Sequence, residues 1–215
     1  GKPVIQHTYE KVYQSGLFDR VIIVTDSDEI ASVVTGFGGD VVRSQKEHDC
    51  GSDRIAEAVV DIDVDIVINV QGDEPFICPE GLSSLIQVFK SDKNKDVDLA
   101  SLMIPITEEI NNPNVVKVIT DLSNRALYFS RSAIPHQRIQ ENHATVYKHV
   151  GVYAFRKNAL IDFYEHDITP LEESEKIEAI RYLEMGKTIQ MVETQFEGVG
   201  IDTDEDLERA KKLMA

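Results

Sequence analysis

Long apolar runs are missing from this 215-residue sequence, and basic residues are few. No run approaches the ~18 residues that span a bilayer, and no signal segment stands at the start, so we expect no membrane association. Lysine and arginine total 22 against 38 aspartate and glutamate residues, a net charge of −16. Nucleic acids and anionic membranes need clustered cations, so both are excluded as partners. A phosphate-bearing substrate would need metal ions or local arginines to overcome the repulsion.

Cysteine is also scarce. Cys50 and Cys78 are the only two, and they form no CxxC pattern. A disulfide between them stays open as an alternative, but two unclustered cysteines are typical of a reduced protein. The sequence therefore predicts a cytoplasmic location.

Several catalytic and ligand-binding motifs are absent as well. The sequence has no GxxxxGK[ST] or GxGxxG phosphate-binding pattern and no GxSxG elbow. Its six histidines form no HxxxH or HExxH pair for zinc. The acidic stretches DIDVD and DTDED lack the sixth-position glycine and the distal glutamate of a calcium loop.

What the first half of the sequence does contain is a regular alternation of helical and extended patterns. Apolar residues at helical spacing alternate with short apolar runs, which are typical of strands buried on both faces of a parallel sheet. This alternation with short connections predicts an α/β fold with a doubly wound sheet. The predicted helices are 4–16, 27–39 and 52–62, and the predicted strands are 20–25, 40–44 and 65–70.

The second half has looser spacing, with strand-like runs and few helices between them. We expect an antiparallel excursion within about 97–156 that serves as a dimer surface, inside a single domain spanning 1–215. Strands are predicted at 98–106, 114–121, 126–130, 148–155 and 188–194, and helices at 158–166, 171–186 and 204–215.

The sequence opens on a helix rather than on a strand. In a doubly wound fold the first strand is usually central, and the loop after it usually holds phosphates. We therefore expect this sequence to be a fragment that lacks the N-terminal first strand and its loop. The alternative is a domain without the usual ligand cradle.

Asp73 is the main candidate for chemistry from residue types alone. It follows the predicted strand 65–70, and ligands of open α/β sheets bind beyond the carboxyl ends of strands. Gly72 has no side chain to keep a ligand off the backbone. Asp202 follows another apolar stretch, so two carboxylates could bracket Mg²⁺ ions bound to a nucleoside triphosphate. The alternative is that Asp73 only caps the following helix.

Five motifs then carry a resemblance that runs in order along the chain: CGSDRIAEAV, VQGDEPF, ALYFSRSAIP, KHVGVYAFR and GIDTDEDLE. Together they resemble the 3-deoxy-manno-octulosonate (Kdo) cytidylyltransferase family. The resemblance implies a mixed sheet of the nucleotide-diphospho-sugar transferase type, a cytoplasmic homodimer and Mg²⁺ dependence. The implied reaction converts CTP and Kdo into CMP-Kdo and pyrophosphate for lipopolysaccharide biosynthesis.

The resemblance also implies roles for individual residues. Asp73 and Asp202 would be the catalytic carboxylates and the metal ligands. The nucleotide would contact Gly51, Ser52, Arg54 and Gly72, and the sugar acid would contact Gln71, Arg131, His149, Tyr153 and Glu178. Without the resemblance, Ser52 would be an ordinary helix-start residue, and Tyr153 would be a packing residue on its strand. Arg131 and His149 would be surface residues or internally hydrogen-bonded ones.

Two departures from the family pattern matter. The Arg- and Lys-bearing loop that wraps the triphosphate is missing, Lys2 is not assigned its role, and we expect the chain to be catalytically crippled. Many members have Glu-Gln where this chain has Glu178 and Ala179, so only Glu178 is carried over. No role is derived for Glu74.

Two other functions remain as alternatives. Related cytidylyltransferases act on sialic acid, but they carry a different sequence at the position of QGDEP. A non-catalytic nucleotide-binding or assembly module is the alternative from another functional class.

Overall fold

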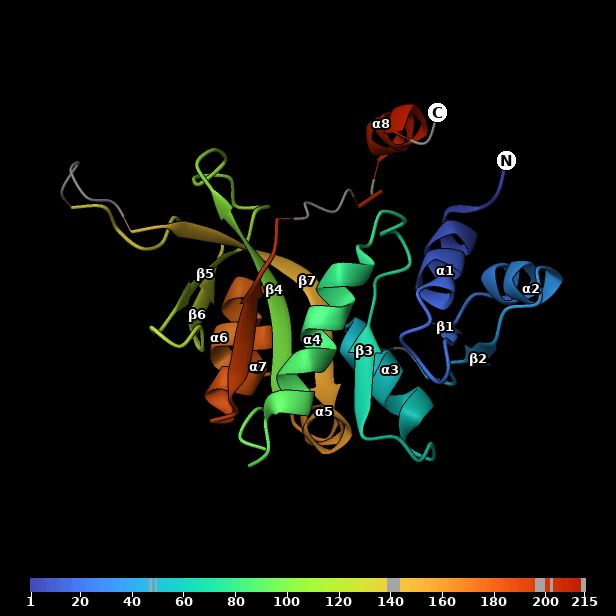
Figure 1. The fold of residues 1–215 in the computed structure, drawn as a ribbon, viewed down its shortest axis with the longest axis horizontal. Helices are drawn as coiled ribbons and strands as arrows, with labels where there is room; N and C mark the ends of the chain where they lie inside the picture. Colours follow the sequence, from blue (N-terminus) through green and yellow to red (C-terminus); the bar gives the residue numbers. More distant parts are fainter. Residues whose placement is uncertain (47, 49, 139–143, 196–199, 202, 214–215) are drawn as a thin grey trace.

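The chain folds into two separate β-sheets with helices packed against them (Figure 1). This arrangement comes from a computed structural model that describes residues 1–46, 48, 50–138, 144–195, 200–201 and 203–213. The helices are α1 (Val4–Gln14), α2 (Asp28–Gly36), α3 (Gly51–Val59), α4 (Pro79–Ser91), α5 (Lys157–Tyr164), α6 (Pro170–Glu175), α7 (Ala179–Glu184) and α8 (Asp204–Leu213). The strands are β1 (Ile23–Thr25), β2 (Val41–Arg43), β3 (Ile66–Asn69), β4 (Leu99–Ile106), β5 (Lys117–Thr120), β6 (Ala126–Ser130), β7 (Val146–Arg156) and β8 (Ile189–Glu193).

The larger sheet has six strands and is organised around the long strand β7. One edge of β7 pairs antiparallel with β4, and the other pairs with β5 near the start of β7 and with β3 near its end. β6 extends the sheet beyond β5, and β8 runs parallel to β4. The antiparallel excursion predicted within 97–156 is therefore confirmed, whereas its role as a dimer surface stays a prediction.

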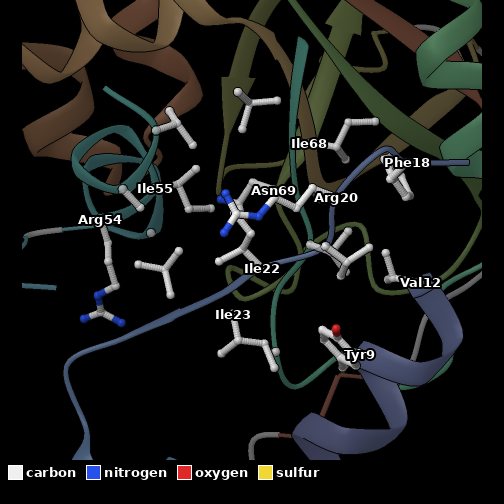
Figure 2. A pocket seen from close by; sticks show the side chains of 18 of the residues that line it. Tyr9, Val12, Phe18, Arg20, Ile22, Ile23, Arg54, Ile55, Ile68 and Asn69 are labelled. Atoms are coloured by element: carbon white, nitrogen blue, oxygen red, sulfur yellow. The ribbon is translucent and has the colours of Figure 1, made fainter. Parts of the chain in front are cut away.

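The smaller sheet consists of β1 and β2, which run parallel, and a cavity of about 390 Å³ separates it from β3 (Figure 2). The side chain of Arg54 in α3 reaches Asp26, just after β1, while Gly51 at the start of α3 lies against Asn69 at the end of β3. The carboxyl ends of β1 and β3 therefore both lie at α3. The doubly wound sheet expected from the sequence is mixed, and it is divided at this cavity.

The cavity lining is mostly apolar. Figure 2 shows Val12 of α1, Ile55 of α3, Ile23 of β1 and Ile68 of β3 around it. Among the described strands, β1 pairs with β2 alone and β3 with β7 alone, so each turns its other edge toward the cavity. The free edges and the apolar lining mark this as the least consolidated part of the sheet.

Apolar side chains cover both faces of the larger sheet. One face packs against α3, α5 and α7 through residues such as Leu160, and the other packs against α1 and α4 through residues such as Leu85. The alternation of side chains along β3 serves both faces, because Val67 joins the first cluster and Ile68 joins the second. Within the described residues, no helix is long and apolar enough to cross a membrane.

Several predicted boundaries were wrong, and two of them have a clear structural cause. The helix predicted over 171–186 is two helices, because Lys176 adopts a left-handed conformation (φ 53°) and ends α6. Arg131 holds this turn by donating to the carbonyls of Glu175 and Lys176. The strand predicted over 20–25 is paired only from Ile23, because β2 offers just three residues as partners.

Candidate active site

The turn after β3 carries Gln71, Gly72 and Asp73. It is closed by the Glu74 amide, which donates to the Gln71 carbonyl at 3.2 Å. The hydroxyl of Thr8 in α1 donates to the Gly72 carbonyl at 2.9 Å. Helix α1 therefore stabilises this turn through a side-chain hydrogen bond to its backbone.

Gly72 has a packing role in this turn. A Cβ atom at this position would lie 2.8 Å from Cδ1 of Ile5, so a larger residue here would require the Ile5 side chain of α1 to move. The prediction that the Gly72 backbone also meets the nucleotide stays a prediction.

The turn at Asp73 meets the chain segment that precedes the last helix. The Ile201 amide donates to the Asp73 carbonyl at 3.0 Å. One residue earlier, Gly200 lies against the Glu74 carboxylate, which is 3.5 Å from the position a Cβ would take. Asp202, the second predicted metal ligand, lies outside the described residues.

The residues at this turn could bind a metal ion that enters the site already bound to the substrate. Within the described part of the chain, no group of three or more His, Cys, Asp or Glu side chains could hold a metal ion. Mg²⁺ needs only one or two protein carboxylates when phosphate oxygens and water complete its shell. Asp73 can supply such a carboxylate, and the chain position next to Asp202 lies beside it.

The N-terminus of α3 brings several predicted site residues together. Gly51 faces the side-chain amides of Asn69 and Gln71, each 3.5 Å from the position that a Cβ would occupy. The hydroxyl of the fully buried Ser52 donates to Oε1 of Glu178 at 3.1 Å. This bond joins residues 126 positions apart and places Glu178 beside the start of α3.

Glu178 sits in a poorly solvated environment. Enclosure by the protein raises the pKa of its carboxyl group, and hydrogen bonds from Cys50 and Ser52 oppose this effect. Tyr153 is buried near the same carboxyl, and its pKa is raised by desolvation first and by the Glu178 charge second. Desolvation likewise raises the pKa of the Cys50 thiol. Cys50 and Tyr153 therefore keep their protons near neutral pH, and Glu178 holds its proton more tightly than an exposed carboxyl group does.

His149 lies deeper in the same face of the sheet. Its Nε2 is 3.0 Å from the Ser101 hydroxyl, and its ring packs 4.9 Å from Phe129 and 5.3 Å from Tyr153. Burial lowers its pKa to about 4, so the imidazole is neutral near pH 7. His149 and Tyr153 are therefore neighbours, as a shared sugar-acid site requires.

Arg131 is already engaged by the protein backbone. Its Nε donates to the Glu175 carbonyl at 2.7 Å, its Nη1 to the Pro113 carbonyl at 3.0 Å, and its Nη2 to the Lys176 carbonyl at 3.2 Å. A guanidinium has five N–H donors, so two are left for a ligand. Binding of the sugar acid by Arg131 stays a prediction, and only these two N–H groups are left to make it.

Two donors near α3 have no hydrogen-bond partner among the described residues: Nε of Arg54 and Nδ2 of Asn69. Arg54 uses Nη2 to bind Asp26 at 3.1 Å. Asn69 is 2 % exposed and lines the cavity. Sequence reasoning missed Asn69, although its position two residues before Gln71 on a strand puts both side chains on one face.

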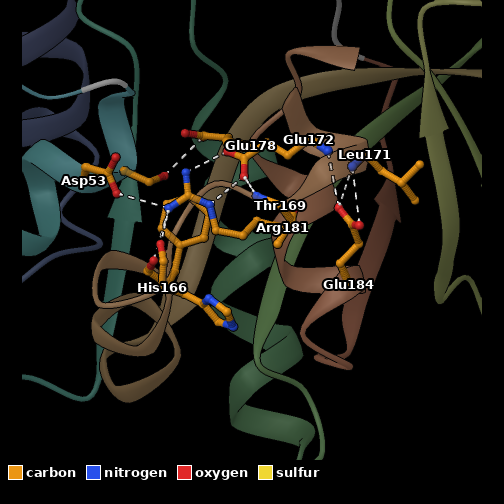
Figure 3. A network of polar contacts seen from close by, with 10 residues as sticks. Asp53, His166, Thr169, Leu171, Glu172, Glu178, Arg181 and Glu184 are labelled. Atoms are coloured by element: carbon orange, nitrogen blue, oxygen red, sulfur yellow. Dashed lines mark hydrogen bonds and ion pairs between the residues drawn. The ribbon is translucent and has the colours of Figure 1, made fainter. Parts of the chain in front are cut away.

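A buried charge network joins α3 to helices α5–α7 (Figure 3). Arg181 is 2 % exposed and donates from Nε and Nη2 to both carboxylate oxygens of Glu172, at 2.6 and 2.7 Å. Its Nη1 donates to the carbonyls of Phe163 and His166 and lies 3.6 Å from Asp53 in the first turn of α3. No sequence pattern indicated this network, because a charged helix face usually points to solvent.

Comparisons with known proteins extend over the whole chain. The family model described as Cytidylyltransferase matches residues 1–189. The chain is 55% identical over 217 residues to the 3-deoxy-manno-octulosonate cytidylyltransferase of Christiangramia forsetii, covering 100% of this chain and 88% of that protein. The enzyme of the same name from Flavobacterium johnsoniae is 56% identical over 216 residues, with the same two coverages. The chain belongs to the 3-deoxy-manno-octulosonate cytidylyltransferase family.

A solved structure supports the family assignment of this cytidylyltransferase. CMP:2-keto-3-deoxy-manno-octonic acid synthetase, solved in complex with CTP, has a TM-score of 0.93 and 36% sequence identity to the chain. The match covers 100% of this chain and 88% of that one. The α/β fold of the nucleotide-diphospho-sugar transferase type is therefore confirmed.

The predicted site residues of this cytidylyltransferase divide into three groups. One group surrounds the N-terminus of α3 and the neighbouring strands: Gly51, Ser52, Gln71, His149, Tyr153 and Glu178. Gly72 and Asp73 form the turn beside this group, and Arg54 extends toward β1. Arg131, directly after β6, forms the third group, and its side chain donates to the carbonyls of the turn between α6 and α7.

Proposed function

We propose that this chain joins CTP to Kdo, forming CMP-Kdo and releasing pyrophosphate for lipopolysaccharide biosynthesis. The observation that carries the proposal is an identity of 55% across the whole chain with a relative of that activity. The site supports it, because Ser52, Gln71 and Glu178 lie together at a helix N-terminus beside the Asp73 turn.

In the proposed reaction, the anomeric hydroxyl oxygen of Kdo attacks the α-phosphorus of CTP. A new O–P bond forms, the bond from the α-phosphorus to the bridging oxygen breaks, and pyrophosphate leaves while the hydroxyl proton is released. Such a transfer asks the protein mainly for positioning and for neutralisation of charge. This chain has few cations for that purpose, given its net charge of −16.

The positioning is assigned to the groups around α3. Gly51 and Ser52 place the nucleotide with the N–H groups of the first helical turn, which favour negative charge. Gln71 and Glu178 bind hydroxyls of the sugar acid. Neutral His149, on a strand of the larger sheet, also binds the sugar acid. These assignments rest on the family motifs and on the shared location of the side chains.

Mg²⁺ belongs to the proposal as the source of positive charge. Asp73 and Asp202 would hold it, and when bound it would neutralise charge on the triphosphate. The Asp73 carboxyl follows a backbone turn that is fixed on both sides, by Thr8 and by Ile201. Such fixation suits a ligand that must meet a metal–nucleotide complex at one defined position.

We also propose that the enzyme is a homodimer, built on the antiparallel excursion. Leu122 in the β5–β6 turn is fully exposed, and Leu127 on β6 is 58 % exposed. A second copy covering them would remove this apolar surface from water. Light scattering after size exclusion tests the proposal, with Leu122→Asp combined with Leu127→Asp expected to give monomers.

The cytoplasmic location is proposed from the cysteines. Cys50 and Cys78 are both free thiols in the structure, which suits a reducing compartment. Fractionation of cells that produce the protein tests this location, and recovery in a membrane or secreted fraction would contradict it.

The deciding experiment for the reaction measures pyrophosphate release from CTP with Kdo or with a sialic acid, with and without Mg²⁺. The chain is assayed beside a version extended at its N-terminus by the strand and loop that the family pattern leads us to expect. Release that needs Kdo and Mg²⁺ supports the proposal. Release with sialic acid alone favours the related activity, and CTP binding without release in either form favours a non-catalytic module.

A further inference from the structure

Lys117, the first residue of β5, is a buried cation outside the groups assigned to the substrates. It has no exposed surface. Its ammonium donates to three main-chain carbonyls, those of Asn112 at 3.0 Å, Val115 at 2.6 Å and Arg131 at 2.5 Å. All three ammonium hydrogens are thereby used, so the charge is satisfied without reaching any ligand.

Arg131 adds a second layer to this arrangement. Its carbonyl accepts from Lys117, and its guanidinium donates to carbonyls of the loop before β5 and of the α6–α7 turn. The Glu175 carboxylate closes the group by accepting from the Ser130 hydroxyl at 2.6 Å and from the Arg131 amide at 2.9 Å. We call Lys117, Ser130, Arg131 and Glu175 the carbonyl clasp, because its two cations donate to six main-chain carbonyls, one of which is that of Arg131 itself.

The clasp holds two segments that carry proposed sugar-acid residues. The Val116 carbonyl, next to Lys117, accepts from the His149 amide at 2.8 Å, and Lys117 is in register with the residue before His149. In the second segment, Glu175 is the last residue of α6 and stands three positions before Glu178. The segment of His149 thus pairs directly with that of Lys117, and the segment of Glu178 is joined to Lys117 through Arg131.

We propose that Lys117 is a positioning residue for the sugar-acid part of the site, holding His149 and Glu178 at their working separation without touching substrate. The proposal rests on the proposed function. Its physical reason is that loss of the ammonium removes a donor from the carbonyls of Val115 and Arg131, whereas the Asn112 carbonyl still accepts from the Val115 amide. The loop before β5 and the segment around Arg131, which holds the α6–α7 turn, must then shift to bring these two carbonyls to water.

The test compares Lys117→Met, which keeps the apolar stem and removes the charge, with Leu85→Ala. Leu85 is fully buried in the cluster on the opposite face of the sheet, so its variant controls for general destabilisation. Titration calorimetry with Kdo and, separately, with CTP gives both affinities. Amide hydrogen exchange reports on the His149 and Lys176 amides, which bond to Val116 and Glu172.

In Lys117→Met we expect Kdo to bind about tenfold more weakly, as when one well-placed hydrogen bond is lost, and the two amides to exchange faster. CTP affinity should stay within about twofold, the usual scatter for independent sites. Leu85→Ala should change neither the Kdo affinity nor the two amides. Equal weakening of Kdo and CTP, or an equal loss of Kdo affinity in Leu85→Ala, overturns the proposal.

A failure of the proposed function would give different binding results from a failure of the positioning role. If the unmodified chain binds CTP but not Kdo, the assigned reaction is wrong, and hydrogen exchange alone decides whether Lys117 holds the two segments. Unchanged exchange at His149 and Lys176 then overturns the positioning role. If Lys117→Met does not fold, Ser130→Ala removes one clasp bond at 2.6 Å and is expected to show the same pattern with smaller changes.

Discussion

The amide of Ile201 donates a hydrogen bond of 3.0 Å to the carbonyl of Asp73. This single bond joins the turn after β3 to a segment more than a hundred residues later in the chain. It fixes the Asp73 backbone where two parts of the predicted metal site meet. The side chain of Asp73 is therefore offered from a backbone position that is held from two directions, by Ile201 and, through Gly72, by Thr8.

The first prediction concerns Asp73 itself. In the form of the protein that releases pyrophosphate, Asp73→Asn should lower turnover by several orders of magnitude, about the scale for loss of a metal-bound or charge-stabilising group. Glu74→Gln is the matched control, because it changes the adjacent carboxylate, for which no role is derived. Pyrophosphate release near the unmodified rate in Asp73→Asn would contradict the assignment.

The pH dependence of stability should carry a contribution from His149. Its pKa is lowered from 6.5 to about 4 in the folded chain, so between these pH values the unfolded state binds the proton more tightly. Stability from this group is complete above pH 6.5 and is lost as the pH falls toward 4. The loss is on the order of 3 kcal/mol at most.

Urea unfolding of the His149→Gln variant across this pH range measures that contribution. The variant should lose less stability than the unmodified chain when the pH falls from 6.5 to 4, while His136→Gln, at an exposed histidine, should behave like the unmodified chain. Parallel curves for His149→Gln and the unmodified chain would show that His149 does not titrate as described.

Removing only one partner of the buried Arg181 network should strongly lower the free energy of unfolding. Arg181→Met leaves the carboxylate of Glu172, itself 6 % exposed, without its partner, so we expect a loss of about 3–5 kcal/mol in the free energy of unfolding. Arg181→Met combined with Glu172→Met should recover part of this loss, because the Glu172 carboxylate is removed together with its cation, whereas Asp53 still lacks Arg181.

An exposed ion pair supplies the control for the Arg181 prediction. Lys211 and Glu208 are 2.6 Å apart, with side chains 60 % and 65 % exposed. Lys211→Gln should therefore change the unfolding free energy by no more than about 0.5 kcal/mol. A comparable loss in Lys211→Gln and Arg181→Met by urea denaturation would mean that burial does not govern these pairs.

The divided sheet leads to a prediction about local opening. The Ile23 amide donates to Asp40 on the β2 side, so the alternate amide of Val24 points toward the cavity. Val24 should exchange its amide hydrogen about a hundredfold or more faster than Leu102 of β4, which has β7 and β8 on its two sides. Equal protection of the two amides would show that the edge facing the cavity is covered in solution.

The fold class followed from local patterns in the sequence. Short apolar runs became β3, β4 and β8, and alternation along β3 serves two apolar clusters, because successive side chains of a strand point to opposite faces. The predicted break between the parallel and antiparallel parts was also visible, since helices are scarce between the runs at 98–155. These features depend on residues that are close together in the sequence, so they can be predicted from the sequence alone.

The end of α6 could not be predicted in this way. No glycine or proline stands within 171–185, and Lys176 adopts a left-handed conformation where Arg131 binds the carbonyls of Glu175 and Lys176. A contact between residues 45 positions apart thus overrides local helix propensity.

Local patterns in the sequence were enough to predict most strands, the turn that carries Asp73 and the family to which the chain belongs. The folded chain was needed to see that Ser52 binds Glu178, that Arg181 lies against the start of α3, and that Lys117 and Arg131 link the segments of His149 and Glu178. The difference lies in the sequence distance over which each interaction acts. Patterns of apolarity act over a few residues, whereas a buried polar group is satisfied by whichever partner the folded chain brings within hydrogen-bond distance.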